Sequence, residues 1–129
     1  RISTLKNSEE NNTGLPELKQ KIMSEMESGN FENACSDINI YKRSAESDAD
    51  ILTAEAALLY YTGDYKAAAI AAECGLLKNE KNADLLYNAG CIYQKIGNPE
   101  RAEVLFRKAI ENCTDLQAKA EIEQELKTL

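Results

Sequence analysis

Apolar residues recur at every third or fourth position along most of this chain. The clearest stretches run from Leu86 to Tyr93 and from Ala102 to Ile110. This spacing places the apolar side chains on one face of a helix and the polar side chains on the other. Weaker stretches of the same kind lie before and after these two. The pattern therefore predicts an all-α protein of about seven helices, each with one buried face.

The chain also repeats itself with a period of 34 residues, because Gly29, Gly63 and Gly97 stand that far apart. Each glycine is followed by Asn or Asp, and an alanine stands five places after each glycine. A glycine after an apolar-periodic stretch ends a helix, since it adopts the left-handed conformation at low cost. The Asn or Asp beside it is expected to cap the next helix. Each repeat thus predicts a helix, a tight turn and a second helix.

The repeats set the expected domain organisation. Residues 1–14 are polar and aperiodic, which predicts a flexible leader. After the third repeat the period restarts without a glycine, and such an end helix covers the apolar flank of the last repeat. We therefore expect one domain over residues 15–129, with repeats and a capping helix at 15–48, 49–82, 83–116 and 117–129.

The third repeat resembles the tetratricopeptide repeat family. Counted from Ala83, it has the large, small and aromatic residues of the family pattern at Leu86, Ala89, Gly90, Tyr93, Ala102, Phe106 and Ala109. The second repeat is a version with more small residues. The first repeat matches least, because Ile22 and Tyr41 replace small residues that let helices approach closely. The resemblance implies a right-handed superhelical solenoid of antiparallel helix pairs over about residues 15–129.

The resemblance also implies that the first helix of each pair lines a concave, peptide-binding groove. The candidate groove residues are Lys19, Met23, Thr53, Ala57, Tyr60, Tyr61, Tyr87, Asn88, Cys91 and Gln94. Several of them lie off the apolar stripes, and tyrosine and methionine are favoured at binding surfaces. The side-chain amide of Asn88 has both a donor and an acceptor for a peptide backbone. The alternative is that the tyrosines only pack against the neighbouring repeat.

Charge narrows the range of partners. The 129 residues carry a net charge of −7 and include no histidine. An acidic surface disfavours nucleic acids and anionic membrane surfaces, and no apolar run approaches the roughly 20 residues that cross a bilayer. We expect a cytoplasmic protein with a protein or peptide partner and no nucleic-acid or membrane partner. It is expected to be a monomer or part of a larger chain.

The candidate chemistry is sparse. The cysteines Cys35, Cys74, Cys91 and Cys113 form no CxxC pair, which favours free thiols used as small apolar core residues in a reducing compartment. Neither a phosphate-binding glycine loop nor a GxSxG motif occurs. We therefore expect no metal, no cofactor and no enzymatic activity.

Two functions fit this sequence. The first is a scaffold that binds a protein or peptide on the concave face of a short repeat array. The second is an accessory, tethering or oligomerisation domain taken from a larger protein. The stretch Ala83–Ile96 looks like repeats appended to bacterial glycosyltransferases, and the chain begins with Arg1 rather than with methionine.

Overall fold

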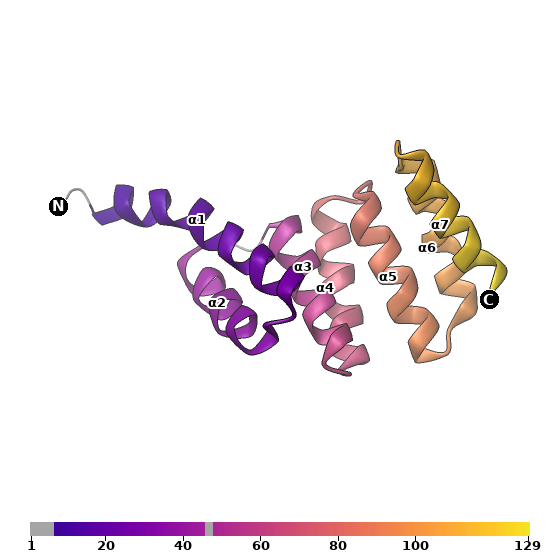
Figure 1. Ribbon diagram of the computed structural model, residues 1–129, viewed down its shortest axis with the longest axis horizontal. Helices are drawn as coiled ribbons and strands as arrows, with labels where there is room; N and C mark the ends of the chain where they lie inside the picture. The colour runs from indigo at the N-terminus through magenta and orange to yellow at the C-terminus, as the bar shows by residue number, and fades with distance from the viewer. Residues whose placement is uncertain (1–6, 46–47) are drawn as a thin grey trace. The chain divides into compact units, whose positions relative to one another are not determined.

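The computed structural model describes residues 7–45 and 48–129, with side chains from residue 15 onward, and within these residues it is all-α (Figure 1). This confirms the fold class predicted from the apolar periodicity. The helices of the described residues are α1 (Asn7–Ser28), α2 (Phe31–Ser44), α3 (Ala49–Tyr61), α4 (Tyr65–Lys78), α5 (Ala83–Ile96), α6 (Pro99–Asn112) and α7 (Leu116–Lys127).

The chain divides into two compact units. The first contains α1 and α2 and ends at Ser47, and the second begins at Asp48 and contains α3 to α7. Within the second unit each helix packs against the next one along the chain, from α3 (magenta) to α7 (yellow) in Figure 1. The division falls at the end of the first predicted repeat, which is the repeat with the weakest family pattern.

The three repeat glycines end helices as the sequence predicts. Gly29, Gly63 and Gly97 have φ angles of 79°, 91° and 92°, which L side chains rarely adopt. Each lies between the two helices of a pair. The recurring glycine is therefore required by backbone conformation.

The predicted caps after these glycines form in two cases out of three. The side chains of Asp64 and Asn98 accept hydrogen bonds from the backbone N–H groups of Ala67 and Arg101, at 3.3 and 3.2 Å. The prediction is wrong for Asn30, whose side chain makes no capping hydrogen bond. Its backbone N–H donates to the carbonyl oxygen of Glu25 at 2.8 Å, a main-chain hydrogen bond that Asp64 and Asn98 also make in their own turns.

Small side chains bring the helices of the second unit together. Ala56, Ala68 and Ala89 are completely buried, so the backbones of α3, α4 and α5 approach closely. On α5, Gly90 lies against the ring of the buried Phe106 from α6, because a Cβ at Gly90 would stand 2.5 Å from Phe106 Cε1. Ile122 from α7 extends this core.

Two element boundaries differ from the prediction. Helix α1 begins at Asn7, within the predicted leader. Once later residues have formed a helix, each further residue whose backbone is fixed adds one hydrogen bond. A polar sequence can therefore extend an existing helix. Residues 1–6 of the predicted leader lie outside the described part of the chain. Helix α7 begins at Leu116, where the Asp115 side chain accepts from the N–H of Gln117 at 2.9 Å.

Candidate functional site

A cleft of about 250 Å³ opens between α3 and α5 in the second unit. Its lining residues are Ala57, Tyr60, Tyr61, Tyr87, Asn88, Cys91 and Ile92. All but Ile92 belong to the groove residues named from the sequence. The structure therefore brings six separately predicted residues, from two repeats, to one concave surface.

The three tyrosines of the cleft differ in how far they are engaged in packing. The Tyr60 ring meets Tyr61 and Tyr65 edge to face, with centroids 5.5 and 5.7 Å apart. The Tyr87 ring lies 5.8 Å from that of Phe106 and packs against the core. Tyr61 remains 63% exposed. Tyr60 and Tyr87 thus pack against neighbouring rings and also line the cleft, whereas the side chain of Tyr61 is largely exposed.

Burial and nearby carboxylates raise the pKa values of three side chains in the cleft. Burial is the largest cause that raises the pKa of the Tyr87 hydroxyl, followed by its hydrogen bond with Cys91. Burial likewise raises the pKa of the Tyr60 hydroxyl and of the Cys91 thiol. The negative charge of Glu125 on α7 adds to all three shifts. At neutral pH the cleft therefore presents neutral hydroxyl and thiol groups beside a carboxylate.

Four predicted groove residues lie elsewhere. The Thr53 hydroxyl donates to the carbonyl oxygen of Ala49 at 2.7 Å, within α3. The Gln94 amide donates to the Thr128 hydroxyl at 3.2 Å, which ties α5 to the residue after α7. Lys19 and Met23 lie on α1 in the first unit. Their part in a common groove stays a prediction.

Three residues that line the cleft or act on it by charge carry little signal in the sequence. Ile92 lines the cleft but is 1% exposed, so by pattern it belongs to the core. Glu121 and Glu125 of α7 act on Tyr87 through their charge. The only available sign was their spacing of four residues, which places both on one face of the last helix.

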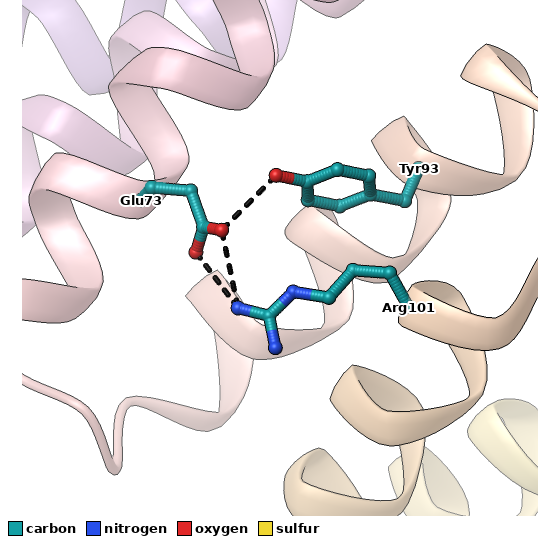
Figure 2. Close-up of polar contacts among 3 residues, drawn as sticks. All are labelled: Glu73, Tyr93 and Arg101. Atoms are coloured by element: carbon teal, nitrogen blue, oxygen red, sulfur yellow. Dashed lines mark hydrogen bonds and ion pairs between the residues drawn. The ribbon is translucent and has the colours of Figure 1, made fainter. Parts of the chain in front are cut away.

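A second, larger groove lies on α4, α5 and α6. It has a volume of about 560 Å³ and includes a polar cluster of Glu73, Tyr93 and Arg101 (Figure 2). The Tyr93 hydroxyl donates to Glu73 Oε2 at 3.0 Å, and Arg101 Nη2 lies 3.0 and 3.1 Å from the two carboxylate oxygens. Each of the three helices contributes one member, so the cluster links two consecutive repeats.

The four cysteines are free, but none of them is fully buried. Cys35 and Cys74 are exposed, which corrects the prediction of buried thiols at these positions. Cys35 follows the buried Ala34 and Cys74 precedes the buried Gly75, so each lies beside the buried face of its helix rather than in it. In the residues that the structure describes, no three Cys, Asp or Glu side chains are grouped so that they could hold a metal ion.

No described helix has the length and apolarity that a membrane span requires.

Pairs of helices joined by glycine turns, with a cleft between their first helices, define a helical-repeat protein. Residues 83–115 match the family model of the tetratricopeptide repeat. This range is almost the whole of the third predicted repeat, so the resemblance to the tetratricopeptide repeat family is confirmed.

Solved structures agree in fold over nearly the whole chain. The type III secretion translocator chaperone SycD of Yersinia enterocolitica matches with a TM-score of 0.81 at 16% identity, covering 92% of this chain and 91% of that one. PcrH from Pseudomonas aeruginosa matches at 0.79 and 18% identity, covering 90% and 91%.

PcrH in complex with the chaperone binding region of PopB matches with a TM-score of 0.75 at 16% identity, covering 90% of this chain and 94% of that one. At these identities the likeness is one of fold. A search of the curated proteins finds no match.

Proposed function

We propose that this protein is a binding scaffold, and that the cleft between α3 and α5 holds an apolar side chain from a segment of another protein. The observation that carries the proposal is the gathering of Tyr60, Tyr61 and Tyr87 around one concave surface. Tyrosine rings bury area at little conformational cost and are enriched among the residues that dominate binding energy.

The size of the cleft favours a side chain over a metabolite. Its volume of about 250 Å³ lies below the roughly 300–1,000 Å³ of typical small-molecule sites. Asn88 at the cleft wall carries a donor and an acceptor that suit the backbone of a bound segment. The similar fold of PcrH, solved with the chaperone binding region of PopB, supports a polypeptide as the ligand class.

Charge favours a basic residue beside the apolar one. Glu121 and Glu125 lie close enough to Tyr87 for their charges to raise the pKa of its hydroxyl. A Lys or Arg of the partner would meet these carboxylates and the faces of the tyrosine rings. The preferred ligand is thus a segment with a large apolar side chain followed or preceded by a cation.

Catalysis at this cleft is disfavoured by the state of its one nucleophilic side chain. The pKa of the Cys91 thiol is raised by burial, and the thiolate is the reactive form of cysteine. The scaffold function requires no such reactivity.

The experiment is a selection from a displayed library of random peptides on the whole chain, followed by affinity measurements of the recovered peptides by titration calorimetry. We expect enrichment of an apolar residue next to Lys or Arg. Tyr61→Ala removes an exposed side chain that lines the cleft, and Glu125→Lys reverses a charge that acts on the cleft from α7. Each should weaken binding by tenfold or more, as hot-spot residues do.

Leu116→Ala is the matched control, because Leu116 is 79% exposed on α7 and does not line the cleft. The affinity of the Leu116→Ala variant for the peptides should equal that of the native chain. Peptides that bind Tyr61→Ala and Glu125→Lys as tightly as the native chain would show that this cleft is not the binding site.

Oligomerisation is the second candidate function, because the groove on α4, α5 and α6 exposes apolar side chains that the fold itself does not cover.

A further inference from the structure

The groove on α4, α5 and α6 carries an unusually exposed pair of large apolar side chains. Leu77 is 89% exposed and Ile70 is 67% exposed, and both belong to α4. They stand seven residues apart, so they lie on the same side of the helix, two turns from each other. Both line the groove of about 560 Å³, whose floor includes the buried Leu86 and Leu105.

The two walls of this groove carry opposite charges. Glu73 on α4 and Glu80 on the link after α4 line one wall, and Arg101 and Lys108 on α6 line the other. Glu73 and Arg101 form an ion pair at 3.0 Å across the groove. Glu80 and Lys108 are both exposed. One wall is therefore acidic and the other basic, with apolar side chains between them.

We propose that this groove is the interface of a two-fold symmetric dimer of the chain. A two-fold axis that runs along the groove places α4 of one copy opposite α6 of the other. Glu80 then faces Lys108 of the second copy, and the reverse pair forms at the same time. Leu77 and Ile70 of each copy become buried in the groove of the other, where apolar contact supplies the main attraction.

The charge pattern selects a second copy over an unrelated partner. A groove with one sign of charge would require an oppositely charged ligand, whereas a groove with one wall of each sign is complementary to itself. In the chain as a whole the net charge is −7, so two copies repel each other unless opposite charges meet locally. The proposed axis provides two such pairs of opposite charges per dimer, each between Glu80 of one copy and Lys108 of the other. The proposal is independent of the cleft between α3 and α5, since the two sites share no lining residue.

The first test is sedimentation equilibrium of the whole chain between about 1 µM and about 1 mM, the range in which weak complexes form. We expect a monomer–dimer equilibrium. Leu77→Ala should raise the dissociation constant roughly tenfold or more, because each dimer buries two copies of the side chain. Leu116→Ala, which truncates an exposed leucine on α7, should leave it unchanged. A chain that stays monomeric over this range, or a dimer that is indifferent to Leu77→Ala, overturns the proposal.

The second test uses charge reversal at the two wall residues. Glu80→Lys alone brings two basic walls together and Lys108→Glu alone brings two acidic ones together, so each variant should dimerise several-fold more weakly than the native chain. A mixture of the two single variants should form a heterodimer in preference to either homodimer. The double variant Glu80→Lys/Lys108→Glu should recover native dimerisation. If the mixture forms no more heterodimer than chance pairing predicts, the proposed axis is wrong.

Discussion

Two carboxyl side chains of the first unit are buried without full hydrogen bonding. Glu25 on α1 and Asp37 on α2 are 8% and 7% exposed. In the described residues Glu25 Oε1 accepts no hydrogen bond, and Asp37 Oδ2 has an ion-pair contact but no hydrogen bond. Lys21 Nζ lies 3.2 Å from Asp37 Oδ2, but the lysine side chain is 62% exposed and so offers a screened charge. Burial, followed by a hydrogen bond with Asp37 and by its charge, raises the pKa of Glu25 above the ordinary value of 4.5.

This shift gives the first unit a pH dependence of definite sign. Because the pKa of Glu25 is raised in the fold, the fold favours the protonated acid. The stabilisation is fully present below the ordinary pKa of 4.5 and is lost as the pH rises through the raised value. We expect amide protection in α1 and α2, measured as the free energy of opening by hydrogen exchange, to fall from mildly acidic to neutral pH.

Glu25→Gln should remove most of this dependence and increase protection at neutral pH, since the amide stays uncharged. Glu27→Gln on the same helix is the control, because Glu27 is exposed. Protection of α1 and α2 that grows with pH in the native chain would contradict this interpretation.

The cysteines allow a second prediction at the residue scale. Burial raises the pKa of the Cys91 thiol, whereas Cys35 and Cys74 are exposed. Iodoacetamide reacts with the thiolate, so Cys91 should be alkylated more slowly than Cys35 and Cys74 at neutral pH, and its rate should rise steeply with pH. Mass spectrometry of peptides sampled over time measures the three rates. Preferential modification of Cys91 would instead indicate an activated cysteine and reopen the possibility of catalysis.

At the scale of single residues, the sequence predicted where a residue lies on its helix better than it predicted which side chains surround that residue. The family resemblance predicted Tyr60, Tyr87 and Asn88 as groove residues, and the structure brings these three to one cleft. The sequence did not predict Glu125 beside Tyr87, since that contact depends on how α7 packs on the preceding helices. Nor did it reveal the buried Glu25, because a glutamate on an amphipathic helix is normally exposed.

Among the helices, the close approach of α5 and α6 is the most specific feature. Gly90 leaves room for the Phe106 ring, whose atoms Cε1, Cδ1 and Cζ would stand 2.5, 2.7 and 3.0 Å from an added Cβ. Phe106 is completely buried, so its ring has little freedom to move away. The glycine and the aromatic residue of the repeat pattern are therefore a matched pair.

Gly90→Ala should lower the free energy of unfolding by roughly 2 kcal/mol, because overpacking costs about 3 kcal/mol and helix propensity returns about 1 kcal/mol. Urea denaturation monitored by circular dichroism measures the change. The double variant Gly90→Ala/Phe106→Leu should lose less than the sum of its single variants, since the smaller side chain relieves the clash. A Gly90→Ala variant as stable as the native chain would show that the helices do not approach this closely.

The helices themselves were the most predictable part of the fold. Glycine turns, apolar stripes and caps such as Asp64 act locally, so a single sequence displays them. The start of α1 was missed because its first residues carry no apolar period. The cap at Asn30 was predicted wrongly because composition does not determine which hydrogen bond a turn uses.

For the whole molecule, the division into two compact units yields a prediction about folding. The second unit has its own core, which extends over α3 to α7 and includes Phe106 and Ile122. A fragment of residues 48–129 should therefore fold without α1 and α2 and unfold in one cooperative transition. Thermal unfolding monitored by circular dichroism measures this. A fragment that is largely unfolded at 25 °C would contradict the division.

The surfaces of the molecule could not be derived from the sequence in the same way. The periodicity identifies which face of a helix is buried. It does not show whether the solvent-exposed face is entirely polar or also carries apolar side chains. Leu77 fits the apolar composition of α4, and only the structure shows that it is exposed.

Binding at the tyrosine cleft is tested most directly by titrating the isotopically labelled chain with one of the selected peptides and recording amide chemical shifts by nuclear magnetic resonance. The largest changes should fall on Tyr60, Tyr61, Tyr87, Asn88 and Cys91, and they should disappear in the Tyr61→Ala variant at the same peptide concentration. Changes confined to α1 and α2, or to α4 and α6, would contradict the assignment of this cleft as the binding site.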